Sequence, residues 1–577
     1  MTLPSFHSII EFNEGSLEYM NNDGIYLPLS GQEFIVSKGL DGSGIPAYMW
    51  LTPGEWEDRT DQFEMDLYSG PKIFYEFPDL EELEADTYEE YKFMYDWVLL
   101  GDALAERIED APPTASASIY SYWSYLEGVW AEELMRNNKV AEETAILAEQ
   151  VQAMGTIGAS GVDRNPGIKK IWKEILKSQH HDISWIEVTD LRRKSISRLQ
   201  DAGTEAMEIM DEITSSLVTN EQNSRAVFNG LPYERETLLN LSSKKSLEGV
   251  SMQEYRGRSL GFVELPPGGF KSFKEQGKPI RSIPGDLPET IYAEAYQVDL
   301  DENGLMRQIS VNGKELLVGE EYRGGELRAR IEKNWKNNRE AETAYYSGSV
   351  FDVVERHGTL GHIPFRERYY FFKHQPVIKV ELEFEFHGDE VGNMWMDETK
   401  INVYYPTSGE DLHHDIPFAY VEAKQDRPLF AINWLHSGGL VYVNRGTIKH
   451  RVEDGVIANV LAWGSSHYSN RLHWDYWTSQ AQYDIRLYGN HTLEYYIIPV
   501  ASFDGNKIAR EVNNLISPVF MTRGGGGQSY YHSMNDHVLP TAVFNKDGKT
   551  WMRGYKLPEE AQTPYRDWEI LNEIILE

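Results

Sequence analysis

Hydrophobic positions in the middle of this chain recur with the period of a helix. Between residues 116 and 222, apolar residues keep helical spacing in three runs, at 131–154, 168–176 and 191–217. A helix with one apolar face must bury that face against another element. This stretch therefore predicts a middle domain of three helices packed antiparallel.

After Val227 the period changes to two. Residues 377–386, for example, alternate between apolar and charged side chains, and Gly, Asn and Asp recur at hairpin-like intervals along this half. Alternation of this kind is typical of strands with one buried face. The pattern predicts a small β domain at residues 223–285, followed by a large antiparallel β-sandwich domain at residues 286–577.

The first 115 residues have a mixed pattern. Short strand-like runs at 25–27 and 34–36 precede an acidic stretch around 80–107 that reads as helical, and two adjacent prolines at 112–113 end the region. Residues 1–115 therefore predict an α/β unit. Together with the helices and strands that follow, they predict a multidomain α+β fold.

Composition narrows the classes of partner. Asp and Glu outnumber Lys and Arg by 91 to 55, which gives a formal net charge of −36. A polyanion would be repelled, and no long run of basic residues offsets this, so nucleic acid is excluded as a partner. No segment approaches the ~20 apolar residues that a membrane span needs. The chain has no cysteine, so thiolate zinc sites and thiol nucleophiles are also excluded. Nothing in the sequence selects a compartment.

Candidate chemistry lies where the second predicted helix ends, at His180, His181 and Asp182. Successive side chains on a helix are rotated by ~100°, so one imidazole can bind a metal while its neighbours do other work. The alternative is a solvated helix end whose dipole favours an imidazole. Residues 411–415 repeat the same three letters, and residues 473–475 offer a His-x-Asp. Both of these later copies are expected to be structural.

The passage from Trp172 to Asp182 closely resembles the helix-to-loop passage of α-mannosidases of glycoside hydrolase family 38. Other segments resemble the family in the same order along the chain, at 39–46, 121–149, 227–235, 263–270, 299–317 and 494–499. In that family the second His of Gln-His-His-Asp is a zinc ligand, and the following Asp contacts sugar hydroxyls. The resemblance thus implies His181 as a metal ligand, and Asp182 and His180 as substrate-binding residues.

The implied activity is retaining, zinc-dependent hydrolysis of α-mannosidic bonds in a mannose-containing oligosaccharide. The family's zinc site also needs an N-terminal His-x-Asp and a nucleophilic Asp, and neither is found in this sequence. Residues 1–115 are therefore interpreted as the C-terminal part of the catalytic domain. The catalytic nucleophile stays unassigned, and the remaining zinc ligands are expected outside this chain, on a second chain or in a missing part of a longer gene product.

Two alternatives stay open beside this incomplete enzyme. One is a catalytically inactive carbohydrate-binding or scaffolding relative of the same family. The other is an unrelated β-sandwich protein with chance similarity. Large sandwiches often bury surface in dimers, so a homo-oligomer is an option under any of the three hypotheses.

Overall fold

The computed structural model describes residues 34–38, 44–48, 131–179, 189–242, 244–392, 396–416, 419–423, 425, 428–464, 486–532, 538–546, 549–556 and 570–576. The chain divides into two compact units, residues 1–124 with 563–570 and residues 125–562 with 571–577. Within residues 1–124, the structure describes the antiparallel strands β1 (Phe34–Lys38) and β2 (Gly44–Tyr48). The α/β prediction for residues 1–115 otherwise lies outside the described residues.

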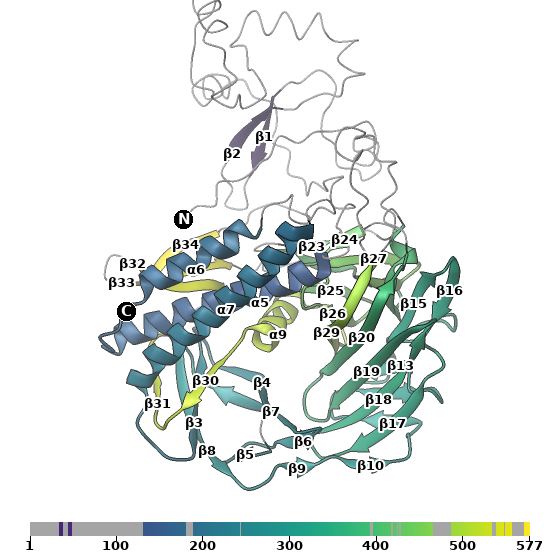
Figure 1. The fold of residues 1–577 in the computed structure, drawn as a ribbon, viewed down its shortest axis with the longest axis horizontal. Coiled ribbons are helices and arrows are strands. Elements are labelled where there is room, and N and C mark those ends of the chain that lie inside the picture. Colours follow the sequence, from purple (N-terminus) through teal and green to yellow (C-terminus); the bar gives the residue numbers. More distant parts are fainter. Residues whose placement is uncertain are drawn as a thin grey trace, which may run out of the picture. The chain divides into compact units, whose positions relative to one another are not determined.

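Three helices form where the helical spacing predicts them. They are α5 (Ala131–Ile157), α6 (Asn165–Lys177) and α7 (Thr189–Leu217). Their shared core contains the small side chains of Ala145 and Ala148, which let the helices approach closely, together with larger groups such as Ile175. Figure 1 shows the three helices lying side by side within their unit.

The large sandwich is built from antiparallel strands, as the period of two predicts. Its main sheet has ten strands in the order β10 (Ile283–Gly285), β17 (Glu342–Ser347), β18 (Phe351–Leu360), β19 (Ile363–Phe372), β20 (Ile378–Asp389), β29 (Leu487–Pro499), β26 (Leu440–Val443), β25 (Trp434–Ser437), β22 (His413–Ile416) and β23 (Ala419–Glu422). Because alternate side chains point to opposite faces, each of the two faces of this sheet can contribute to a different core.

Two further sheets pack with the main sheet around one core. The six-stranded sheet has the order β16 (Asn334–Asn337), β15 (Glu326–Ile331), β21 (Ile401–Pro406), β28 (Val456–Ala462), β27 (Lys449–Glu453) and β24 (Pro428–Phe430). The four-stranded sheet has the order β11 (Thr290–Tyr292), β12 (Gln297–Leu300), β13 (Met306–Val311) and β14 (Lys314–Glu315). Their apolar faces meet the main sheet around Tyr369, Tyr405 and Tyr495. The short helix η4 (Asp397–Thr399) precedes β21.

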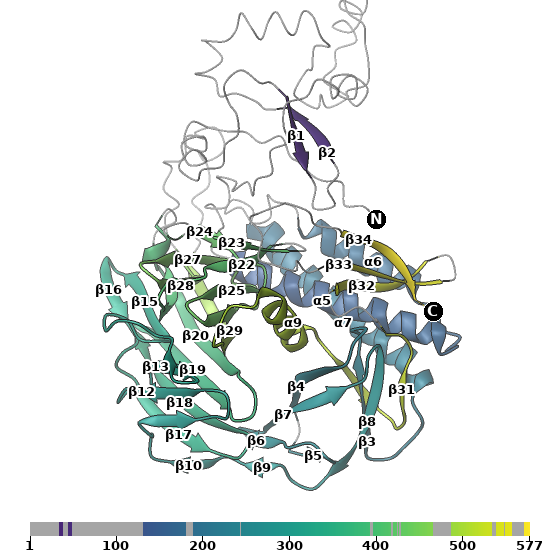
Figure 2. The same cartoon turned by 180° about the vertical axis from the view of Figure 1, so that it is seen from behind.

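A pair of smaller sheets follows the helices. One has the order β30 (Phe520–Arg523), β3 (Ser224–Asn229), β8 (Gly269–Gln276) and β31 (Gly527–Ser529), with β5 (Ser246–Leu247) also pairing with β8. The other has the order β4 (Arg235–Leu241), β7 (Arg258–Leu265), β6 (Gln253–Tyr255) and β9 (Ile280–Arg281). Figure 2 shows both sheets from behind, below the helices.

The end of the chain returns to these smaller sheets. Strands β30 and β31 lie in the range 286–577, where the sequence pattern predicts the large sandwich, but they pair with β3 and β8. A separate sheet of β32 (Val538–Lys546), β33 (Lys549–Lys556) and β34 (Ile570–Leu576) packs on α5 through β32. The chain is mainly β with few helices, which is consistent with the predicted multidomain α+β fold in its coarse form, while the four domain boundaries stay predictions.

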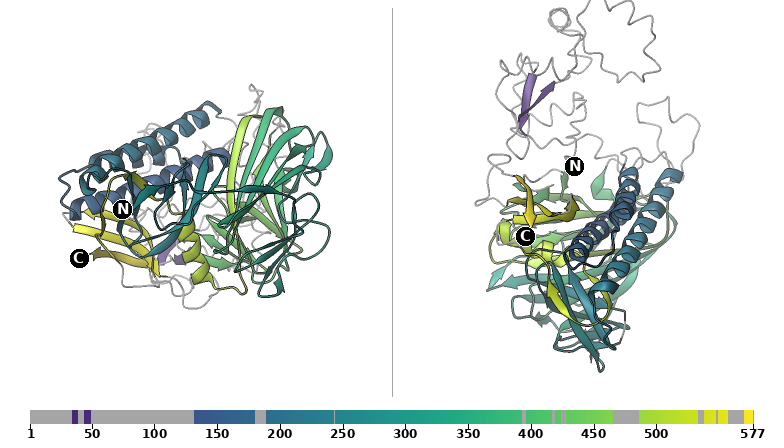
Figure 3. Two further views of the ribbon diagram at one scale, coloured as in Figure 1. Left: turned by 90° about the horizontal axis from the view of Figure 1, so that it is seen from below. Right: turned by 90° about the vertical axis from the view of Figure 1, so that its left-hand side faces the viewer.

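Helix α9 (Gly505–Ile516) lies between the large sandwich and β4, as Figure 3 also shows. Buried Arg235 of β4 donates hydrogen bonds from Nη1 to the carbonyl oxygens of Asn514 and Ser517, and from Nη2 to that of Pro518. These carbonyls, at and just beyond the end of α9, have no further helical turn to supply their donors. Arg235 thereby joins α9 to the small β sheet.

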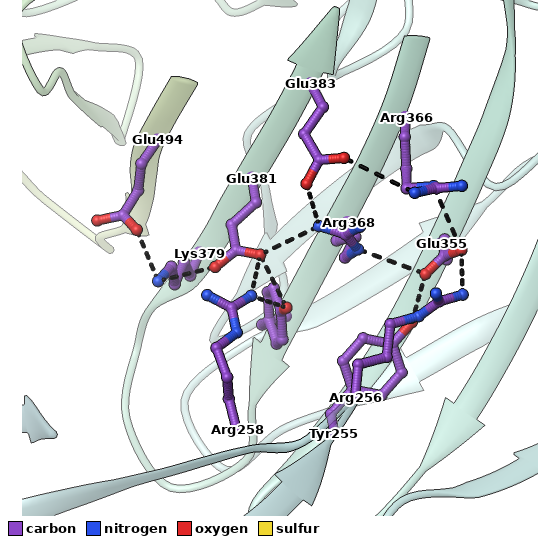
Figure 4. A network of polar contacts seen from close by, with 11 residues as sticks. Tyr255, Arg256, Arg258, Glu355, Arg366, Arg368, Lys379, Glu381, Glu383 and Glu494 are labelled. Carbon is purple, nitrogen blue, oxygen red and sulfur yellow. Dashed lines mark hydrogen bonds and ion pairs between the residues drawn. The ribbon is translucent and has the colours of Figure 1, made fainter. Parts of the chain in front are cut away.

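The β6–β7 hairpin is tied to the main sheet by charged groups. Arg256 pairs with Glu355 at 2.6 Å, and Arg258 pairs with Glu381 at 2.6 Å. Figure 4 shows both pairs within one network that continues through Lys379 to Glu494. Among the described helices, none is long and apolar enough to cross a membrane.

Candidate functional site

Helix α6 leads directly to the predicted His-His-Asp motif. Pro166 lies in its first turn, where the missing backbone N–H costs no helical hydrogen bond. Ile168, Ile171 and Ile175, at spacings of three and four, form its buried face. After Lys177 two further backbone hydrogen bonds follow: the Ser178 N–H donates to the Ile175 carbonyl oxygen at 2.9 Å, and the Gln179 N–H donates to the Leu176 carbonyl oxygen at 3.2 Å. These residues account for the course of the chain as far as Gln179, where the described segment ends.

The three predicted site residues, His180, His181 and Asp182, lie outside the described residues. Their assignment as substrate-binding residue, metal ligand and sugar-binding carboxylate therefore stays a prediction. What the structure places is the residue directly before them. Gln179 Nε2 donates to Asn138 Oδ1 at 3.0 Å and to Glu142 Oε1 at 2.5 Å, both on α5.

The end of α6 is also tied to α7. The guanidinium of Arg198 lies 3.2 Å from Glu174 Oε2 through Nε, and its Nη1 donates to Ser178 Oγ at 3.4 Å. Ser178, which is buried, in turn donates from Oγ to the Glu174 carbonyl oxygen at 3.0 Å. Side chains from two different helices thus hold residues 178 and 179.

Burial changes the acidity of two carboxyl groups on α5. It raises the pKa of Glu142, against the opposing effect of the hydrogen bonds from Gln179 and Asn138. It also raises the pKa of Glu149 to about 7, although the Trp172 indole N–H donates to Glu149 Oε1 at 2.8 Å. A buried carboxyl with a pKa near neutrality can exchange a proton at physiological pH.

The second His-His-Asp copy has a structural role, as predicted. His413, His414 and Asp415 are buried in β22. His413 Nδ1 donates to the Asp411 carbonyl oxygen at 3.0 Å, and its ring stacks on Phe503 with centroids 3.9 Å apart. Burial lowers the pKa of His414 to about 4, so this imidazole is neutral at pH 7. The third candidate, residues 473–475, lies outside the described residues.

The Asp415 carboxylate holds the backbone at the start of β25 in place. Its carboxylate accepts hydrogen bonds from the backbone N–H groups of Asn433 and Trp434, at 2.8 to 3.0 Å, and from Asn433 Nδ2 at 2.7 Å. Burial raises its pKa to about 6 despite these donors. Within the part of the chain that the structure describes, no group of three or more His, Asp or Glu side chains could hold a metal ion.

The arrangement of the elements has close counterparts among solved structures. An α-mannosidase from Enterococcus faecalis V583 superposes with a TM-score of 0.66 at 14% identity, over 91% of this chain and 77% of that chain. A protein in glycosyl hydrolase family 38 from Enterococcus faecalis gives a TM-score of 0.64 at 13% identity, with the same coverage. This chain has a glycoside hydrolase family 38-like fold. No family model and no curated protein match it in sequence.

The likeness confirms the resemblance that the sequence motifs indicate, at the level of the fold. At 13–14% identity it assigns no residue role. The contacts of Gln179 were missed in the sequence, although one signal was present. Asn138 and Glu142 stand four residues apart, the spacing that places two side chains on one face of a helix. That spacing does not predict that Gln179 is the residue that contacts them.

Proposed function

We propose that this chain is part of a zinc-dependent α-mannosidase that hydrolyses α-mannosidic bonds in oligosaccharides with retention of configuration. The observation that carries the proposal is the fold shared over 91% of the chain with a structure described as an α-mannosidase. The motif at residues 180–182 adds to it, because it directly follows a helix that side chains of α5 and α7 hold in place.

In this proposal His181 is a zinc ligand. Neutral imidazole is a common donor to zinc, but such sites are usually made by three or four protein ligands. The described residues offer no group of three, so this chain's described part does not fit the ion by itself. The remaining ligands are accordingly proposed to lie outside this sequence, on a second chain or on a further part of the same gene product. Bound zinc would hold sugar hydroxyls, and no reaction step is derived through it.

Asp182 and His180 are proposed to bind the substrate. An ionised carboxylate accepts hydrogen bonds from sugar hydroxyls, and such charge-assisted bonds contribute about 1.5 to 3 kcal/mol each. Retaining hydrolysis needs two carboxyl groups about 5 to 5.5 Å apart, one as nucleophile and one as acid. Neither role is assigned to a residue of this chain. The proposed substrate is a mannose-containing oligosaccharide, with neither nucleic acid nor a membrane as a partner.

The test measures release of the aryl group from an aryl α-mannoside. The chain alone is expected to be inactive, and addition of the polypeptide encoded directly upstream is expected to restore hydrolysis that a chelator abolishes. Asp182→Asn should then reduce kcat/KM by about tenfold or more, as loss of a charge-assisted hydrogen bond predicts. Robust hydrolysis by the isolated chain would refute the incomplete-enzyme account. Inactivity of every assembly, with mannoside binding retained, would favour the carbohydrate-binding relative.

A homo-oligomer is compatible with the proposal, and light scattering of the purified chain measures it directly.

A further inference from the structure

The hairpin of β15 and β16 exposes its largest apolar side chain. Figure 1 shows this hairpin at the outer edge of the sandwich, away from the three helices. Ile331 of β15 belongs to the sandwich core, and Lys336 of β16 lies on the same inner side, because a Cβ built on Gly361 would be 3.4 Å from Ile331 Cδ1 and 3.2 Å from Lys336 Cγ. Trp335, the neighbour of Lys336, therefore points outward and is 57% exposed. Since a strand with one buried face normally turns its polar side chains to water, packing on the core does not account for this indole.

The same hairpin is basic, although the chain as a whole is strongly acidic. Residues 323–339 contain six Lys or Arg side chains and two Glu side chains, whereas the whole chain has a formal net charge of −36. One of the two carboxylates, Glu326, is buried and pairs with Arg328 at 2.7 Å and with Arg339 at 3.0 Å. The remaining cations of the hairpin give this edge of the sandwich a positive charge, which favours an anionic ligand.

Two of these cations lie close to the indole in the hairpin. Arg330 is directly opposite Trp335 in the strand register, so both side chains stand on the outward face. Lys333 is exposed in the turn between the strands. Among the residues that the structure describes, no carboxylate pairs with Arg330 or Lys333, and no ring or cation stacks on Trp335. An aromatic face, a guanidinium and an ammonium group are therefore available to a ligand on one hairpin.

Hydrogen bonds hold the turn that carries Lys333. Its two residues, Glu332 and Lys333, have φ of 49° and 69°, the left-handed region that two-residue hairpin turns require and that Asn or Gly usually occupies. Arg330 Nε donates to the Lys333 carbonyl oxygen at 3.2 Å, and Asn334 Nδ2 donates to the Glu332 carbonyl oxygen at 3.1 Å. A turn restrained in this way needs little further ordering when a ligand binds, which favours affinity.

We propose that the outward face of the β15–β16 hairpin binds a mannose-containing oligosaccharide that carries phosphate or carboxylate groups. A sugar ring packs its C–H groups on the flat face of Trp335, and the anionic group is held by Arg330 and Lys333. A guanidinium suits this role because it can donate two parallel hydrogen bonds to a phosphate or a carboxylate. The choice of mannose rests on the proposed function. The binding surface itself uses none of residues 180–182.

The test is calorimetric titration of the intact chain with four probes. They are phosphorylated mannan, mannan oxidised to carboxylates at C6, neutral mannan and inorganic polyphosphate. At least one charged mannan is expected to bind about tenfold or more tightly than neutral mannan and than polyphosphate, because it alone offers both a sugar ring and an anion. The charged mannan that binds more tightly identifies the anionic group.

Two variants separate the roles of the ring and of the charge. Trp335→Ala should weaken binding of the charged mannan by about tenfold or more, whereas Trp335→Phe, which keeps a ring, should retain most of the affinity. Arg330→Gln should bring the affinity for charged mannan close to that for neutral mannan and reduce its dependence on salt. The matched controls Tyr292→Ala and Arg307→Gln alter an exposed ring on β11 and an exposed cation on β13, and both should bind as the parent does. Circular dichroism checks that each variant is folded.

Three results would overturn the proposal: no binding of either charged mannan, equal affinity of the parent for polyphosphate and charged mannan, or parent-like binding by Trp335→Ala. The titration measures binding by the chain alone, so it separates this inference from the proposed function. Binding that Trp335→Ala loses, in a chain whose assemblies never hydrolyse a mannoside, would support the surface and count against the mannosidase. An active assembly in which Trp335→Ala binds charged mannan as the parent does would leave the proposed function standing and overturn the surface.

Discussion

The indole N–H of Trp172 in α6 donates a hydrogen bond to Oε1 of Glu149 in α5, at 2.8 Å. Burial between the helices raises the pKa of this carboxyl to about 7, and the indole donor and nearby Arg553 only partly oppose that effect. The raised pKa makes the packing of the helices on one another sensitive to pH. It also places a titrating group two turns along α5 from the residues that hold Gln179.

Glu149→Gln is expected to change how stability depends on pH. The folded state binds the Glu149 proton more tightly than the unfolded state does, so its contribution is present below about pH 4.5 and is lost as pH rises to about 7. The glutamine of the variant does not titrate, so the variant does not lose stability in this way. Its free energy of unfolding, relative to the parent, should rise by up to about 3 kcal/mol between pH 4.5 and 8. Urea unfolding at both pH values measures the difference, with exposed Glu208→Gln as the control. A difference that does not vary with pH would contradict the assignment.

Acidification should weaken the sandwich through its buried imidazoles. Burial lowers the pKa of His414 to about 4 and that of His450 to about 3. Because the ordinary value is near 6.5, their contribution to stability is present above that pH and is lost as pH falls toward 3. In His450→Gln, unfolding should take up about one proton fewer than in the parent. The free energy of unfolding should therefore fall less steeply as pH decreases. The exposed histidine variant His357→Gln should leave the transition unchanged, and an equal slope in His450→Gln would argue against a buried neutral ring.

Arg235→Met should destabilise the contact between α9 and the small sheet. The variant leaves the carbonyl oxygens of Asn514, Ser517 and Pro518 without the donors that Arg235 supplies. Each buried polar group without a partner costs about 1 to 3 kcal/mol, so a loss of at least about 3 kcal/mol is expected. Arg235→Lys retains one charged donor and should lose less. Urea unfolding gives the energies and proteolysis within residues 505–516 locates them. Protection of α9 that equals the parent's would show that Arg235 does not hold it.

Comparing Gly446→Ala with Gly489→Ala separates the cost of a steric clash from the cost of a positive φ. Gly446 has φ of 109° and no space for a Cβ beside Arg136, whereas Gly489 has φ of 83° and nothing within 4 Å of an added Cβ. Both alanine variants carry the strain of a positive φ, roughly 1 kcal/mol. The Gly446 variant must also move α5 away from the sandwich, so its loss of stability should exceed that of Gly489→Ala by about 2 kcal/mol or more. Thermal unfolding compares them, and equal losses would show that the contact at Arg136 can yield.

Much of the local structure could be predicted from this sequence, because helical and strand periods are local signals. The runs at 131–154, 168–176 and 191–217 fall within α5, α6 and α7, and the alternation at 377–386 falls largely within β20. Pairing between distant segments could not be predicted. Strand β30 pairs with β3 across almost 300 residues of chain, and no local pattern records which strand is its neighbour.

In the candidate site, too, local features could be predicted from the sequence and long-range contacts could not. The letters at 180–182 could be found in the sequence, and so could the structural role of their repeat at 413–415, because that copy lies in a strand-like, aromatic-rich segment. The supports around Gln179 could not be found. The spacing of Asn138 and Glu142 on one helix face is visible, but Gln179 follows about 40 residues later and reaches them only through the packing of α6 on α5. Such contacts depend on packing between elements.

Zinc content measured by elemental analysis tests the central claim most directly. The chain would be purified together with the polypeptide encoded upstream, in the parent form, as His181→Ala and as the exposed histidine control His374→Ala. The account predicts stoichiometric zinc in the parent and in His374→Ala, and its loss in His181→Ala. Retention of zinc by His181→Ala, or no zinc in the parent assembly, would contradict it.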